Sequence, residues 1–273
     1  MSTFDKILTF LRFEMERPGN YSPFHIAFLL LTIAVTVFLI RRFRDSDEKT
    51  ARRILLGAWI TLVIFEVYKQ VIFSYDGNAA TPWSYPWYIF PFQLCSNPLY
   101  VFPFAAFLKK GPAKDAVVSF LATFSVFGGL AVMFYPNDVF TSVGGVNVQT
   151  MIHHGTQVAV GLFLAARHRR NWSLKVFLKG VIPFALLSAI AIGLNEFMHV
   201  YFTNNGIDAT FNMFYISRHH PCTLPVLSAI YPKVPYPAFL ILYLVGFVLV
   251  AGIIFGAEAG CIRLARRSGR KEA

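Results

Sequence analysis

The stretch that decides the fold is FHIAFLLLTIAVTVFLIR, residues 24–41, which carries no acidic residue, lysine or arginine before its last position. An α-helix needs about 20 apolar residues to cross the hydrocarbon core of a bilayer. The basic segment RRFRDSDEKTARR follows at 41–53. An apolar run that ends on arginines is typical of a transmembrane helix whose basic end faces the cytoplasm.

Similar apolar runs recur along the whole chain. The 273 residues are 56% hydrophobic and 14% charged, whereas soluble domains carry about 25% charged residues. We therefore predict an all-α, polytopic membrane bundle of seven transmembrane helices over residues 24–262, with no room for a separate soluble domain. The remaining predicted spans are 53–73, 91–108, 115–134, 150–167, 176–201 and 237–262.

The two ends of the chain flank this predicted bundle. Residues 1–23 lack the apolar h-region of a cleavable signal peptide. Their segment FDKILTFLRF favours a short amphipathic helix that lies at the membrane interface, although a loosely ordered leader is an alternative. Residues 263–273 are expected to form a basic cytoplasmic tail.

The positive residues behind the net charge of +11 are concentrated in particular loops. Lysines and arginines gather in 41–53, 109–114, 167–179 and the tail, while the alternate connections are aromatic and nearly free of them. This pattern predicts an outer N-terminus and a cytoplasmic C-terminus in a multi-pass protein of the cell membrane. It argues against a nucleic-acid partner. The longest connection, roughly 202–236, is rich in aromatic residues and is expected to fold back over the outer helix ends.

Polar residues from several predicted helices fall at one depth, about a turn below the outer interface. Ionisable residues inside membrane helices are costly and usually face a partner or a wet cavity. Their convergence predicts a water-accessible cavity that opens to the outer leaflet. The residues concerned are Glu66, Lys69, Gln93, Cys95, Asn97, His153, His154, Asn195, Glu196, His199, Arg218, His219 and His220.

Cys95 is the candidate nucleophile of this cavity. Pro98 cannot donate a backbone N–H, so carbonyls near Cys95 are expected to be free of helical hydrogen bonds. A thiolate paired with an imidazole suits acyl transfer, with His154 as general base and then acid. The amide of Gln93 or Asn97 would stabilise the oxyanion.

Simpler interpretations of these residues stay open. Glu66 and Lys69 suit an internal ion pair that fastens one helix to its neighbours. A lone membrane cysteine is usually a small apolar filler, and Cys95 could also form a disulfide with Cys222. A packing histidine would explain His199 equally well.

Three motifs resemble those of the YwaF family of integral membrane proteins. They are PFQLCSNPLY at 91–100, MIHHGTQV at 151–158 and FNMFYISRHHPCTLPVLSAIYPKVPYPAFL at 211–240. Asn212, Tyr215 and Arg218 match the last motif in register, whereas the histidines after Arg218 replace a lysine. The resemblance covers roughly residues 55–260 and implies kinship with a eukaryotic phospholipid acyltransferase, with Cys95 as nucleophile and His154 as its partner.

Three functions therefore compete. The first is an acyltransferase or lipid hydrolase that acts on membrane phospholipids without a cofactor, with Arg218 and Lys69 holding the phosphate. The second is a zinc-dependent hydrolase whose ligands come from the outer histidines and Glu196. The third is a non-enzymatic transporter or receptor for a small anion or lipid, because topology alone does not give function.

Overall fold

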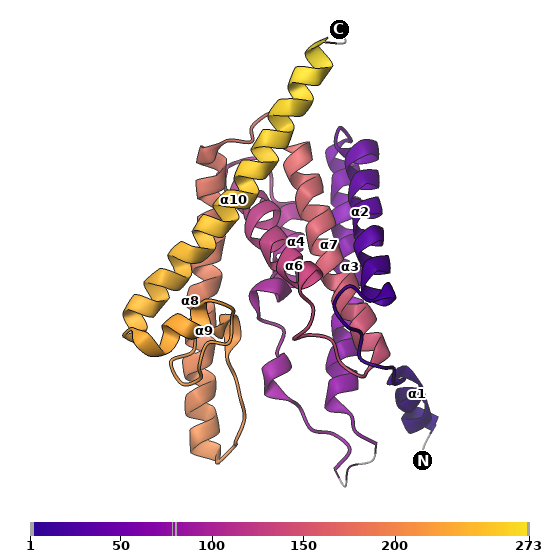
Figure 1. The fold of residues 1–273 in the computed structure, drawn as a ribbon, viewed down its shortest axis with the longest axis vertical. Helices are drawn as coiled ribbons and strands as arrows, with labels where there is room; N and C mark the ends of the chain where they lie inside the picture. The colour runs from indigo at the N-terminus through magenta and orange to yellow at the C-terminus, as the bar shows by residue number, and fades with distance from the viewer. Residues whose placement is uncertain (1–2, 78, 80, 272–273) are drawn as a thin grey trace.

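The protein forms an elongated helical bundle whose two termini lie at opposite ends (Figure 1). The computed structural model describes residues 3–77, 79 and 81–271, and within these ranges it contains helices and two isolated β-bridges but no strand. The all-α prediction is confirmed. Residues 1–2 of the predicted leader and 272–273 of the predicted tail lie outside the described residues.

Five helical segments of the described chain are long and apolar enough to span a membrane. Their outward faces repeat apolar residues at every fourth position, as in Leu178, Ile182, Leu186 and Ile190 of α8, all exposed. Lipid contact explains this exposure, because the bilayer core is itself apolar. The segments are α2 (Pro23–Phe43), α3 (Glu48–Ser74), α5–η3–α6 (Pro112–Phe134), α8 (Leu174–Asn205) and α10 (Tyr236–Lys271).

Two of the seven predicted spans differ from this description. The third, expected as a helix over 91–108, is α-helical only as α4 (Pro98–Phe107), which the 3-10 helix η2 (Leu94–Ser96) precedes, while residues 91–93 are not helical. The fifth corresponds to α7 (Gly144–Arg167), which is long but too polar to count as a candidate span. The described residues thus contain five candidate spans where seven were predicted, and the orientation of the termini stays a prediction.

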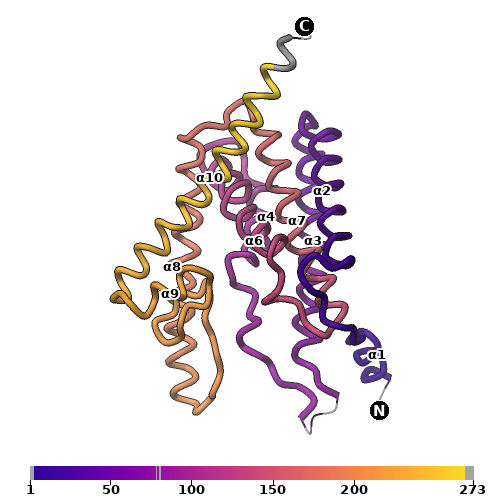
Figure 2. Tube along the Cα trace, in the orientation of Figure 1, coloured from indigo at the N-terminus to yellow at the C-terminus, as the bar shows by residue number. Residues whose placement is uncertain are grey.

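Helix α7 is the central element and packs against α2, α3 and α6 (Figure 2). Its polar side chains, including Asn147, Gln149 and Gln157, are buried inside the protein rather than exposed to lipid. Close helix approach is permitted by Gly129 of α6, where a Cβ would lie 2.9 Å from the carbonyl oxygen of His154. The interior position of α7 explains why its composition is unlike that of a lipid-facing helix.

The basic connections meet at the end of the bundle that carries the C-terminus (Figure 1). Arg169, after α7, donates to Asp45 between α2 and α3 at 2.5 Å, and this hydrogen bond lowers the pKa of the Asp45 carboxyl. Lys114 and Arg167 both contact Glu48 at the start of α3. The three predicted cytoplasmic loops therefore form one ion-paired surface.

The opposite end holds the N-terminal helix and the longest connection. Helix α1 (Thr3–Leu11) buries Leu8 against α3 and residue 143, and leaves Phe4, Ile7 and Phe10 exposed. The 206–235 connection contains η4 (Met213–Tyr215), α9 (Leu227–Ile230) and η5 (Tyr231–Lys233). Residues 211, 213, 214 and 216 are buried, so this connection packs back onto the bundle as predicted.

Candidate active site around Cys95

Cys95 lies in an irregular segment that leads into α4. The short 3-10 helices η1 (Trp87–Ile89) and η2 (Leu94–Ser96) precede Pro98, which occupies the first turn of α4. Proline suits that position because its missing N–H would have no helical partner there. The structure therefore places Cys95, which is partly buried, in the irregular segment just before α4.

Helix α7 holds Cys95 through its backbone carbonyl. The Nε2–H of His153 donates to this oxygen at 2.9 Å, and the side-chain amide of Gln157 donates to the same oxygen. The two donors are four residues apart, so they lie on one face of α7. Side chains of α7 thus satisfy the carbonyl that Pro98 was expected to free.

The neighbouring histidine has a different arrangement. The Nδ1–H of His154 donates to the carbonyl of Thr150 at 2.7 Å, within α7. In a neutral imidazole the other ring nitrogen is an acceptor, which leaves Nδ1 of His153 and Nε2 of His154 as lone-pair nitrogens. The rings lie 5.3 Å apart. His154 was the predicted partner of Cys95, but the hydrogen bond to the Cys95 carbonyl is made by His153.

Several polar atoms at this position are buried without a hydrogen-bond partner in the described chain. Buried polar groups are nearly always hydrogen-bonded, and each one left unpaired costs about 1–3 kcal/mol. Such atoms gather at functional sites, because a substrate or water can pair with them. They are Oε2 of Glu66, both side-chain polar atoms of Asn97, Nδ1 of His153, Nε2 of His154 and Oε1 of Gln157.

Glu66 and Lys69 of α3 complete this set. Lys69 Nζ lies 2.8 Å from Oε1 of Glu66, and the two side chains are 17% and 8% exposed. Gln70 also donates to Oε1 of Glu66. Both charges lie within electrostatic range of Cys95. We call Glu66, Lys69, Cys95, Asn97, His153, His154 and Gln157 the buried site.

A second group of predicted residues fastens the 206–235 connection. Gln93 donates to the carbonyl of Asn212 and accepts from the N–H of Phe214. Asn195 of α8 forms the same pair of bonds with Met213. Both amides are engaged with backbone, so Asn97 rather than Gln93 has an uncommitted amide.

The clamped backbone is strained next to Cys95. Phe214 and Tyr215 both have a φ near +59°, at 59° and 58°. Such conformations cost about 1–3 kcal/mol in non-glycine residues and gather at functional sites. Burial raises the pKa of Tyr215 to about 12, and Cys95 is close enough to contribute. The connection thus brings a tyrosine to the buried site.

The remaining predicted residues form a partly exposed group in the second half of α8 and in the 206–235 connection. Arg218 donates to Oε2 of Glu196 at 2.6 Å, and the His219 ring contacts the same oxygen at 3.1 Å. The rings of His199 and His219 stack with centroids 3.5 Å apart. We call Glu196, His199, Arg218 and His219 the rim cluster. It is distinct from the buried site, whereas the sequence had grouped both into one cavity.

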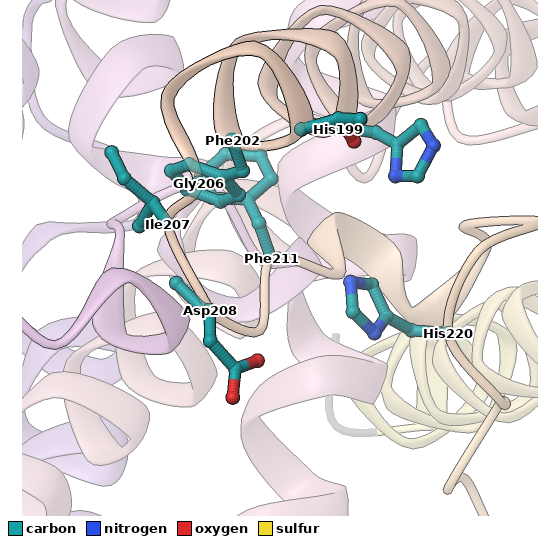
Figure 3. A pocket seen from close by; sticks show the side chains of 9 residues that line it. His199, Phe202, Gly206, Ile207, Asp208, Phe211 and His220 are labelled. Atoms are coloured by element: carbon teal, nitrogen blue, oxygen red, sulfur yellow. The ribbon is translucent and has the colours of Figure 1, made fainter.

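A pocket of about 310 Å³ lies beside the rim cluster (Figure 3). It is bounded by the end of α8 and by the beginning of the connection that follows. His199 belongs both to this pocket and to the rim cluster. The lining residues are His199, Phe202, Thr203, Gly206, Ile207, Asp208, Ala209, Phe211 and His220.

The cysteines and possible metal ligands bear on two alternatives. Cys95, Cys222 and Cys261 are all free, so the Cys95–Cys222 disulfide is not formed. Across the described residues, no group of three or more His, Cys, Asp or Glu side chains is placed to hold a metal ion. The zinc hypothesis therefore finds no ligand set in this part of the chain.

Comparison with known protein families identifies the family to which the chain belongs. The sequence profile of the TMEM164 family matches residues 20–256. The chain belongs to the TMEM164 family. The predicted membership of the YwaF family is wrong, and the implied link to a phospholipid acyltransferase loses its basis. No curated protein and no solved structure matches the chain.

TMEM164 membership agrees with the apolar helices, so the chain is a multi-pass membrane protein. All three motifs quoted for the other family lie within the matched residues.

The sequence alone did not single out Gln157 or the pair Gln70 and Tyr85, in which the tyrosine hydroxyl donates to the amide oxygen at 2.7 Å. The position of Gln157, one helical turn after His153, was the available signal.

Proposed function

We propose that this TMEM164-family protein is a membrane acyltransferase or lipid hydrolase that acts on phospholipid esters through Cys95. The observation that carries the proposal is the double hydrogen bond from His153 and Gln157 to the carbonyl of Cys95. It fixes a free cysteine against His153, and the ring of the neighbouring His154 lies 5.3 Å from that of His153, with one nitrogen of each ring uncommitted. The predicted location in the cell membrane remains part of the proposal.

The first half-reaction transfers an acyl group to the enzyme. His154 Nε2 accepts the thiol proton, and the Cys95 sulfur attacks the ester carbonyl carbon. When the tetrahedral intermediate collapses, the C–O ester bond breaks and the C–S bond remains. The leaving alcohol takes the proton from His154, which leaves a thioester on Cys95.

The second half-reaction decides between transfer and hydrolysis. A second alcohol, activated by His154, attacks the thioester and yields a new ester, whereas water yields a free acid. His153 acts as a positioning residue, since its N–H holds the backbone of Cys95. The buried, uncommitted amide of Asn97 is the proposed donor to the oxyanion, and loss of one such donor typically costs about 10²–10³ in kcat.

The decisive test compares two cysteine variants in phospholipid vesicles that carry a radiolabelled acyl chain. Cys95→Ala should lower acyl release and transfer by at least about 10³-fold, as expected when a nucleophile is removed. Cys222→Ala is the matched control and should retain activity, because Cys222 lies outside the buried site. Full activity of Cys95→Ala would overturn the proposal and favour a non-enzymatic binding protein.

The two histidines can be separated by conservative substitution. Replacement His154→Gln removes the proton acceptor and should reduce the rate by about 10²–10⁴-fold. His153→Gln keeps a side-chain N–H for the carbonyl of Cys95, so most activity should remain. The reverse order of effects would assign the role of base to His153.

A further inference from the structure

The pocket at the outer end of α8 combines apolar walls with two imidazoles. Phe202, Ile207 and Phe211 supply the apolar surface, and His199 and His220 supply ring N–H groups. Its volume of about 310 Å³ is at the lower end of the range for small-molecule sites. A ligand of this pocket must therefore be small and must carry both an apolar part and a polar part.

The charges around the pocket are unevenly placed. His199 and His220 lie on one side of the pocket, and Asp208 lies on the other with its carboxylate directed away from His199 (Figure 3). The nearby Glu196 carboxylate is already shared by Arg218 and His219. The histidine side thus presents ring hydrogen-bond donors, while the charge of the Glu196 carboxylate is neutralised by Arg218.

We infer that this pocket binds the phosphate of an amphiphile, with His199 and His220 as donors and the phenyl rings against the adjoining apolar part. Imidazole N–H groups and a nearby arginine suit phosphate oxygens. The inference rests on the proposed function in that the amphiphile is the phospholipid substrate.

The pocket is connected to the buried site through a short path. Phe211 lines the pocket and contacts Phe90, with ring centroids 5.4 Å apart. The next residue, Asn212, accepts a hydrogen bond from Gln93, two residues before Cys95. A phosphate held at His199 and His220 would therefore place the rest of the lipid along the segment that carries Cys95.

Binding should depend on pH. Burial, with the neighbouring His219 and His199, holds the pKa of His220 below its ordinary value. The ring is therefore uncharged near neutral pH and becomes charged on acidification, so affinity for phosphate should rise as pH falls. The facing charged groups are Glu196 and His199 on α8, and Asp208, Arg218 and His219 on the connection.

The test is calorimetric titration of the full-length protein, purified in maltoside detergent, with three probes. They are dihexanoyl phosphatidic acid, dihexanoylglycerol and inorganic phosphate. The lipid with phosphate should bind at least tenfold more tightly than either of the others. If dihexanoylglycerol binds as tightly as dihexanoyl phosphatidic acid, the pocket does not recognise phosphate and the inference is overturned. If inorganic phosphate binds as tightly as dihexanoyl phosphatidic acid, the apolar part contributes nothing and the ligand is not an amphiphile.

Variants locate the binding. His199→Gln and His220→Gln should each weaken binding of dihexanoyl phosphatidic acid about tenfold, and His220→Gln should flatten its pH dependence. Asp208→Asn should strengthen binding, because a repelling charge is removed, and this opposite sign cannot arise from misfolding. His168→Gln, at the other end of the bundle, is the control. Unchanged binding in both histidine variants, or weaker binding in Asp208→Asn, would overturn the inference.

Binding and acyl-transfer activity of the same variants test the pocket and the proposed function separately. Cys95→Ala should bind dihexanoyl phosphatidic acid as the wild type does, since the pocket contains no part of the thiol. If Cys95→Ala keeps its acyl-transfer activity while the histidine variants lose binding, the proposed function fails and the pocket stands. If the histidine variants bind normally while Cys95→Ala is inactive, the pocket fails and the proposed function stands.

Discussion

The buried site and the rim cluster use similar residues in opposite environments. The buried site sets Glu66 and Lys69 at 8% and 17% exposure, beside several polar atoms without partners. The rim cluster sets Glu196 and Arg218 at 31% and 58% exposure, with their contacts made to each other and to His219. The contribution of an ion pair to stability depends on how strongly water screens its charges. The two sites should therefore respond very differently to the same kind of substitution.

The largest difference is expected when one charge is removed from each pair. Lys69→Met leaves the Glu66 carboxylate buried with only Gln70 as a donor, which should cost about 3–5 kcal/mol in free energy of unfolding. The measurement is unfolding of the detergent-purified protein by titration with sodium dodecyl sulfate. The double variant Glu66→Gln/Lys69→Met should recover most of the loss, because no uncompensated charge remains. A loss below about 1 kcal/mol for Lys69→Met would show that the pair is hydrated.

A second contrast concerns backbone packing next to each site. Gly129→Ala would place a Cβ 2.9 Å from both the His154 carbonyl oxygen and the Val158 side chain, so about 1–3 kcal/mol of stability should be lost. The displaced α7 should also reduce acyl-transfer activity by up to about 10²-fold. Gly193 of α8, close to the rim cluster, has open space around it. Gly193→Ala is therefore the matched control, and equal losses in the two variants would contradict the packing described for α6 and α7.

The helical architecture could be predicted because it depends on local composition. Apolar runs such as 24–41 meet the length that a bilayer requires, and the basic connections identify one end of the bundle. The two failures have different causes, the first in tertiary context and the second in local sequence. α7 is polar because protein rather than lipid surrounds it, and the 91–108 segment is only partly helical because its prolines disrupt it.

The candidate site was predictable as a set of residues but not as an arrangement. Cys95 stands out because Gln93 lies two residues before it and Asn97 two residues after it. Pro91 and Pro98 flank these three residues. Which histidine touches it depends on the rotation of α7 by one residue, about 100°, and periodicity alone does not fix that rotation. The separation of Glu196 and Arg218 from Cys95 likewise depends on how the 206–235 connection folds. Short motifs also pointed to the wrong family.

A third contrast tests the hydrogen bonds that hold Cys95. Gln157→Leu removes one of the two donors to its carbonyl and should cost about 1 kcal/mol, because His153 still donates. The variant also removes a buried acceptor without a partner, which limits the loss. The double variant His153→Phe/Gln157→Leu leaves the carbonyl unpaired, so its loss should exceed the sum of the single losses. Additive losses would show that the two donors do not share this acceptor.

The smallest effect is expected at the rim cluster. Arg218→Met removes an exposed partner of Glu196, but His219 still contacts that carboxylate, and Asn195 and Gln93 still hold the backbone of the connection. The unfolding midpoint should therefore change less than in Gln157→Leu, and the difference from wild type should vanish at about 0.5 M salt, where exposed charges are screened. A large loss that persists at high salt would mean that the rim cluster is desolvated in the membrane-bound protein, and the distinction between the two sites would then rest on their hydrogen bonds alone.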